Sequence, residues 1–336
     1  EALALSRRAL FAAQQANAPE SLYRWHWQVG RILAAQGALA EAIPSYQQAV
    51  LVLSGIRFDM AHGYATGGGS FREAVGPVFY ELVDLLLRTA PEPSDAPAHQ
   101  ARLREARETL ERLKAAELRD YFRDECVDAM QAKVESLDAA ARSALVIYPV
   151  VLPDRLELLL TFPSGMRRAT VPVRAEVLTS EVRTFRALLE KRTTRQYLAH
   201  AQQLYDWLVR PFADQLEGLG VDTLVFVPDG PLRIIPMSAL HDGEHFLIER
   251  YAVVTTPGLS LTDPRPLDRL NMRVFLSGLS ESVQGFPPLA HVPAELDAIH
   301  TLYGGDVLLD EQFRAPRFEA ELDQSEWSVV HVATHG

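Results

Sequence analysis

The chain has 336 residues, of which 48% are hydrophobic and 23% charged; this composition is typical of globular proteins, and the length suggests two or three domains. Its formal net charge of -11 disfavours nucleic acid and anionic membranes as partners. We see no apolar stretch long enough for a membrane span and no signal peptide. The single cysteine, Cys126, excludes an internal disulfide and a cysteine-rich zinc site, so we expect a reducing, cytoplasmic location.

Residues 1–142 are expected to form a helical region. Two helical runs in 21–55 are separated by Gly37, a helix stop. Small and large residues recur there at fixed offsets, at Gly30, Leu33, Ala42, Tyr46 and Ala49. This spacing resembles a tetratricopeptide repeat, with His26 at the repeat's usual tryptophan position and Trp27 beside it. Ala2, Ser6 and Ala9 reproduce the second helix of an earlier repeat, so we expect further repeats upstream of Glu1.

Three more helices are expected at about 71–90, 97–118 and 124–139, joined by loops at 66–70 and 91–97. Their polar faces carry no chemical motif, so we interpret the region as a scaffold. The concave face of such a repeat array would bind a protein partner.

The sequence period changes near residue 143. Residues 144–151 and 155–162 predict a β-hairpin, and 169–178 another strand. Helices are expected at about 178–191, 194–218 and 292–304, and short strands at 223–228, 251–257, 272–278 and 328–333. Alternating strands and helices predict an α/β domain over 143–336, whose sites lie beyond the carboxyl ends of the strands.

Several ordered motifs in this second region resemble one family. Asp229-Gly230 follows a strand, Pro236-Met-Ser-Ala-Leu240 comes next, and Leu247-Ile-Glu-Arg-Tyr251 leads into another strand. The final segment reads His-Val-Ala-Thr-His-Gly over 331–336. Together they resemble the CHAT domain, a caspase-like peptidase module often fused to tetratricopeptide repeats. The resemblance implies a caspase–hemoglobinase fold, with a parallel-rich sheet flanked by helices, and a catalytic histidine–cysteine pair.

The resemblance makes His335 the proton-transfer group, because imidazole side chains accept and donate protons near neutral pH. Gly336 would let the backbone approach the scissile carbonyl and donate its N–H to the oxyanion. His331, on the same side of the strand, either supports the site or is a hydrogen-bonded core residue. From the His-Gly pair alone, an ordinary loop histidine would be the simpler interpretation. A zinc site is disfavoured, because the segment is β-branched and no third ligand is evident.

The motifs quoted above include no cysteine that could act as the nucleophile. Cys126 lies in the helical region, about 200 residues before His335, and is expected to be a helix-packing thiol. The family's cysteine follows the histidine, so we expect it beyond residue 336, in residues lost from this chain or on a second chain; a natural fragment is the third explanation. A sheet ending at its catalytic strand would expose an unpaired edge, which favours missing residues.

The resulting hypothesis is a cysteine endopeptidase that cleaves a protein substrate, is regulated by a protein bound to the repeats, and needs no cofactor. The alternative is a catalytically inactive interaction scaffold, and a metal hydrolase is a third hypothesis. Asp229-Gly230 could also be an acidic site, although a turn explains it. The glycine run at 66–70 is interpreted as a connector, and the basic run at 190–196 as a solvated patch.

Overall fold

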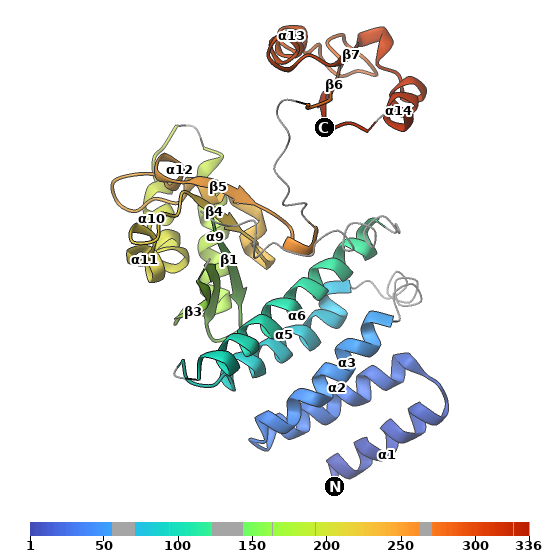
Figure 1. The fold of residues 1–336 in the computed structure, drawn as a ribbon, viewed down its shortest axis with the longest axis vertical. Coiled ribbons are helices and arrows are strands. Elements are labelled where there is room, and N and C mark those ends of the chain that lie inside the picture. The colour runs from blue at the N-terminus through green and yellow to red at the C-terminus, as the bar shows by residue number, and fades with distance from the viewer. Residues whose placement is uncertain are drawn as a thin grey trace. The chain divides into compact units, whose positions relative to one another are not determined.

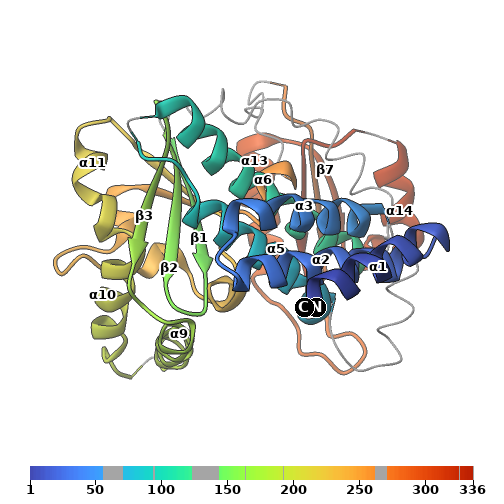
Figure 2. The same cartoon turned by 90° about the horizontal axis from the view of Figure 1, so that it is seen from below.

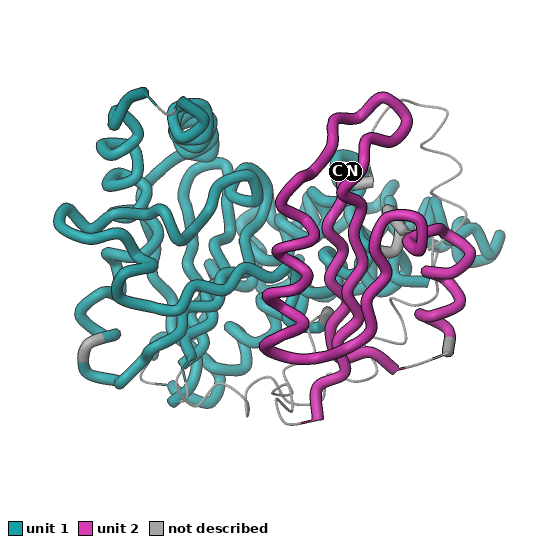
Figure 3. The backbone as a smooth tube through the Cα atoms, turned by 90° about the horizontal axis from the view of Figure 1, so that it is seen from above, with its two compact units in different colours: residues 1–264 teal, residues 265–336 magenta. Residues whose placement is uncertain are grey.

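The structure, a computed structural model, describes residues 1–55, 71–93, 95–122, 144–162, 164–191, 193–261, 271–324 and 326–335. The chain divides into two compact units, residues 1–264 and 265–336 (Figure 3). The boundary predicted between residues 142 and 143 rests on the change of sequence period, and it stays a prediction.

Unit 1 begins with three helices that pack in succession, α1 (Ala2–Gln15), α2 (Pro19–Ala35) and α3 (Leu39–Gly55) (Figure 1). The turn between α2 and α3 contains Gly37 with φ +81°, a conformation that glycine adopts without strain. The predicted helix pair around Gly37 is therefore confirmed. Tyr46 of α3 is buried against Gly30 of α2, where a Cβ atom would meet the tyrosine ring at 2.6 Å.

This close approach predicts opposite outcomes for two glycine substitutions. Gly30→Ala should destabilise unit 1 by about 1–3 kcal/mol through overpacking, because Tyr46 is held by a hydrogen bond to Glu81 and cannot move aside. Gly55→Ala, at the end of α3 with open space around it, should be neutral or slightly stabilising. Urea denaturation of both variants checks this; equal stabilities would contradict close packing of α2 on α3.

The helices α5 (Phe71–Arg88) and α6 (Ala96–Phe122) follow and correspond to two of the predicted helices. Their buried leucines share one hydrophobic core with α3 and with Val146, Tyr148 and Val150. These two helices therefore cover one face of the sheet that comes next. The helix predicted at 124–139, the connector at 66–70 and Cys126 lie outside the described residues.

A five-stranded sheet forms the centre of unit 1, in the order β3-β2-β1-β4-β5. Its strands are β1 (Ala144–Val151), β2 (Leu156–Phe162), β3 (Gly165–Val171), β4 (Thr223–Phe226) and β5 (Ala252–Thr255). The predicted hairpin is confirmed as the antiparallel β1–β2 pair, whereas β1–β4 and β4–β5 are parallel. The helices α9 (Ala175–Leu189) and α10 (Tyr197–Leu208) cover the other face (Figure 2).

Two predicted elements end well before the residue expected for them. The strand expected at 169–178 is β3, which ends at Val171 because Pro172 has no N–H for the ladder, and α9 begins at Ala175. The helix expected at 194–218 ends at Leu208, since Pro211 interrupts it, and a 3-10 turn and α11 (Ala213–Glu217) follow. A further short helix, α12 (Leu247–Arg250), precedes β5.

Unit 2 is a three-stranded parallel sheet in the order β7-β6-β8. It consists of β6 (Val274–Gly278), α13 (Val292–Tyr303), β7 (Asp306–Leu309), α14 (Ala315–Gln324) and β8 (Val329–Ala333). The sequence patterns predicted β6, α13 and β8 but missed β7 and α14. The expected α/β architecture is thus present, as one mixed and one all-parallel sheet in the residues that the structure describes.

Candidate active site in unit 2

The carboxyl ends of the three parallel strands of unit 2 lie at one edge of their sheet. β6 is the middle strand and is buried along its whole length. Its last residue, Gly278, lies against Val292 and Leu296 of α13, so closely that a Cβ atom would meet the Val292 side chain at 2.6 Å. The backbone N–H of Leu279 then donates to the carbonyl of Ala333, at 3.0 Å, which joins the ends of β6 and β8.

His335 lies two residues beyond β8, at this edge. Its side chain is half-buried, and its Nε2 atom is buried without a hydrogen-bond partner among the described residues. The imidazole packs against Phe286, with ring centroids 5.0 Å apart and ring planes tilted by 31°. Because buried polar atoms in proteins are nearly always paired, an unpaired imidazole nitrogen is a candidate for a group that engages a reacting molecule.

Phe286 belongs to the loop between β6 and α13. The loop is closed by hydrogen bonds from the Leu289 N–H to the Ser280 carbonyl, at 2.9 Å, and from the Ser282 hydroxyl to the Phe286 carbonyl, at 2.7 Å. Sequence reasoning did not single out this loop. A phenylalanine in a glycine- and proline-rich segment directly after a buried strand was the signal that could have found it.

Asp310 follows β7 at the same edge, with φ +51°. Its carboxylate accepts the backbone N–H and the hydroxyl of Ser280, at 2.6 and 2.7 Å, and the N–H of Glu281 at 3.2 Å. Burial pushes the pKa of Asp310 upward, but these hydrogen bonds outweigh it and hold that pKa below the ordinary value of 3.8. Asp310 is therefore a carboxylate at neutral pH and bridges the ends of β7 and β6.

Of the other predicted residues, the structure describes His331 but not Gly336 or Cys126. His331 is paired in register with Leu276 of β6, and its Nε2 lies 2.9 Å from a carboxylate oxygen of Glu295 on α13. This contact joins strand and helix, while a supporting role in catalysis stays a prediction. Gly336, the predicted oxyanion donor, lies outside the described residues, as does Cys126.

In unit 1, Asp229 does more than form a turn. It is only 4% exposed and precedes Gly230, whose φ is +52°, so the predicted turn is present. A cluster of charged and phenolic side chains surrounds its carboxylate, which we name the Asp229 cluster: Arg72, Tyr80, Lys114, Glu117, Asp229 and Arg233. Its members come from α5, α6 and the turn after β4, so it ties both helices to the sheet.

The charges in the Asp229 cluster compensate one another. Asp229 lies 2.8 Å from Arg72, 3.2 Å from Arg233 and 3.9 Å from Lys114. Burial would raise the pKa of Asp229, but Lys114 and Arg72 outweigh it and hold that pKa below its ordinary value. Burial in turn lowers the pKa of Lys114, against the attraction of Asp229. With each charge bonded to a neighbouring protein group, the cluster has the character of a structural ion network.

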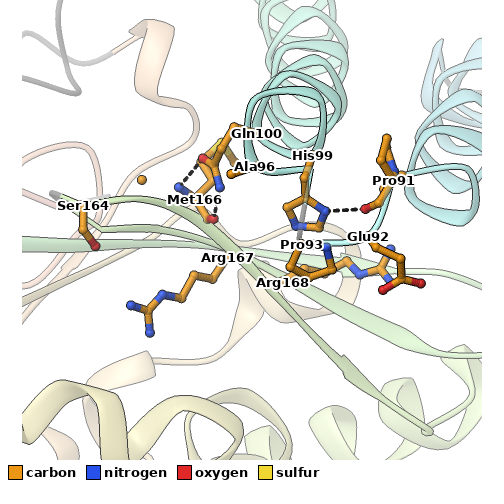
Figure 4. Close-up of a pocket in the computed structure, with 12 residues that line it drawn as sticks. Pro91, Glu92, Pro93, Ala96, His99, Gln100, Ser164, Met166, Arg167 and Arg168 are labelled. Atoms are coloured by element: carbon orange, nitrogen blue, oxygen red, sulfur yellow. Dashed lines mark hydrogen bonds between the residues drawn. The ribbon is translucent and has the colours of Figure 1, made fainter.

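A pocket of about 660 Å³ lies between the loop joining α5 to α6 and the edge strand β3 (Figure 4). Gln100 pairs with both backbone groups of Met166, as a neighbouring strand would, at 2.8 and 2.7 Å. His99 contacts the carbonyl of Pro91, at 2.7 Å. Because these polar groups already bond to the protein, the pocket reflects the packing of α6 on the edge strand.

Within the part of the chain that the structure describes, no helix is both long and apolar enough to cross a membrane. No three histidine, cysteine, aspartate or glutamate side chains within the described ranges come together as a metal site.

The fold and the site thus define an α/β protein with a histidine at the carboxyl end of a parallel strand. Residues 198–336 match the family model of the CHAT domain, and this match supports a CHAT-domain protein. It covers less than half of the chain and includes His331 and His335. No curated protein matches the sequence.

Proposed function

We propose that this chain belongs to a caspase-like cysteine endopeptidase in which His335 transfers protons and a protein partner regulates activity through the N-terminal helices. One observation carries the proposal. The Nε2 atom of His335 is buried and has no hydrogen-bond partner among the described residues. His335 lies beyond the carboxyl end of a parallel strand, within the segment that matches the CHAT domain. The carboxyl edge of a parallel sheet is where α/β folds form their sites, and the half-buried imidazole lies at this edge.

The proposed role of His335 is proton transfer in two steps. It assists formation of a thiolate, and it then protonates the amine that leaves when the peptide bond breaks. The N–H of Gly336 is proposed to bind the oxyanion, a contribution worth about 10²–10³ in rate for one donor.

The nucleophile is proposed to be a cysteine that follows residue 336 in the natural polypeptide. Cys126 precedes His335 by about 200 residues, whereas the family resemblance expects a cysteine after the histidine. The thiolate form of the cysteine is the species that attacks the carbonyl carbon. An imidazole beside the thiol lowers the free-energy cost of forming the thiolate, because it accepts the thiol proton.

The N-terminal helices are proposed to be tetratricopeptide-like and to bind a regulatory protein. The close approach of Tyr46 to Gly30 supports this, because such repeats pack an aromatic ring against a small residue. The helices α1 to α3 stack in succession, as repeat helices do.

The test is cleavage-site mapping by proteomics with the natural full-length protein, its His335→Ala variant and a control variant, His300→Ala, which changes an exposed histidine of α13. New protein termini should appear with the wild-type and control proteins and be lost with His335→Ala. A thiol-directed inhibitor should abolish them as well. Cleavage that persists in His335→Ala contradicts the proposal, and serine or alanine in place of the downstream cysteine would instead favour an inactive scaffold.

A further inference from the structure

We propose that Asp310 and Phe286 are positioning residues for His335: Asp310 anchors the loop at 279–291, and this loop lays the Phe286 ring on the imidazole. The inference rests on the proposed function, because positioning matters for activity only where His335 transfers protons. All of the contacts that carry it lie within unit 2.

Asp310 anchors the start of the loop at 279–291. Asp310 adopts φ +51°, a left-handed conformation that aspartate and asparagine tolerate better than most residues. In this conformation one carboxylate oxygen accepts the N–H groups of Ser280 and Glu281, and the other accepts the Ser280 hydroxyl. Hydrogen bonds to an ionised acceptor are stronger than neutral ones. Asp310 thereby holds the first residues of the loop at the point where it leaves β6.

Hydrogen bonds within the loop at 279–291 determine its shape. Leu289 returns to Ser280 through a backbone hydrogen bond, so the anchor holds both ends of the intervening segment. Within it, the N–H of Phe286 donates to the carbonyl of Val283 at 3.0 Å, and the Ser282 hydroxyl donates to the Phe286 carbonyl. These bonds place Phe286 by its backbone rather than by burial of its side chain.

The ring of Phe286 contacts the imidazole of His335. Phe286 is 52% exposed, so burial in a core does not explain its position, and yet its ring packs on that of His335. A neighbouring ring limits the torsions that the imidazole can adopt and keeps water from one side of it. Proton transfer depends steeply on such placement, since a displacement of about 1 Å can cost about 10²-fold in rate.

The test uses four variants of the full-length protein. Asp310→Gly removes the acceptors while permitting the positive φ, whereas Asp310→Asn keeps an oxygen acceptor and tolerates the same conformation. Phe286→Leu removes the aromatic ring but keeps an apolar side chain. Asp306→Asn, at the exposed start of β7, is the matched control.

The first readout does not require activity. With ¹³Cε1-labelled histidine, and the His335 resonance assigned by its loss in His335→Ala, Phe286→Leu should remove the ring-current shift of that resonance. Asp310→Gly should move it in the same direction, while Asp310→Asn and Asp306→Asn should leave it near its wild-type position.

The second readout is peptide cleavage. Asp310→Gly and Phe286→Leu should lower kcat by about 10- to 100-fold with KM within about twofold. Asp310→Asn should retain most of kcat, and Asp306→Asn all of it. Wild-type resonance positions and kcat in both Asp310→Gly and Phe286→Leu would overturn the inference while leaving the peptidase proposal intact. If the wild-type protein cleaves nothing, the proposed function fails, and the resonances alone decide whether the loop positions His335.

Discussion

Asp229→Asn should lower the free energy of unfolding of unit 1 by about 3–5 kcal/mol, because it leaves buried positive charge without its partner. Asp229 is 4% exposed and Lys114 is 3% exposed, so water does not replace the lost carboxylate. Three cations of the cluster would then share one remaining carboxylate, that of Glu117. Hydrogen exchange of the β1 and β4 amides across a urea series measures the loss in this unit specifically.

An exposed ion pair in the same unit supplies the matched control. Asp206 of α10 lies 2.8 Å from Arg210 in the 3-10 turn that follows, but the two side chains are 48% and 54% exposed. Because exposed pairs contribute little, Asp206→Asn should cost no more than about 1 kcal/mol. Equal losses for Asp206→Asn and Asp229→Asn would contradict the view that burial makes the Asp229 cluster strong.

A double variant separates lost charge pairing from lost packing. In Asp229→Asn combined with Lys114→Met, the buried cation and its partner are both gone, so part of the stability should return. Recovery will be incomplete, because Lys114 also donates to the carbonyl of Pro228 at 2.9 Å. No recovery at all would mean that the turn geometry, rather than the unpaired charge, sets the loss.

The same cluster predicts a dependence on acid. The folded-state pKa of Asp229 is depressed below 3.8, so its stabilisation is fully present above the unfolded pKa and is lost as the pH falls through the folded pKa. The stability difference between wild type and Asp229→Asn should therefore be constant above about pH 5 and shrink below pH 3.8. A difference that grows in acid would contradict the depressed pKa.

The sequence predicted best those elements whose signal is local. The strands β1, β2 and β6 are buried runs in which apolar residues predominate, and α13 begins near a proline and is capped by Gly304, which has φ +67°. By contrast, β7 offers only three apolar residues between Asp306 and Asp310, a shorter run than those at 223–228 and 251–257 from which β4 and β5 were predicted. Strand prediction from periodicity needs more residues than that.

Contacts between distant segments escaped prediction for a different reason. Arg72 and Asp229 are 157 positions apart, and nothing in the spacing of either segment indicates that their side chains meet. The site shows the same contrast: the final motif identified His335, but the ring of Phe286 reaches it from a loop about 50 residues earlier. A sequence motif can identify a candidate catalytic residue, whereas the residues that position it are identified only from the three-dimensional structure.

Gly305→Ala should be the most damaging single change in unit 2, at about 3–5 kcal/mol. Gly305 has φ +107°, and a Cβ atom there would lie 2.1 Å from the backbone oxygen of Val274, which cannot rotate away. Since Gly305 precedes β7 and Val274 begins β6, the collision forces apart the two strands at the start of their pairing. Gly304→Ala is the matched control, because it also requires a positive φ but meets no atom within 4 Å.

The two glycine variants should differ by about 1–3 kcal/mol, the cost of the backbone collision beyond the strain that they share. Hydrogen exchange of the β6 amides measures it. The damage should extend to the candidate site, because β7 places Asp310 and β6 places Ser280: the ¹³Cε1 resonance of His335 should shift in Gly305→Ala much more than in Gly304→Ala. Equal exchange in the two variants would mean that β7 is not held against β6 in the register on which the position of Asp310 depends.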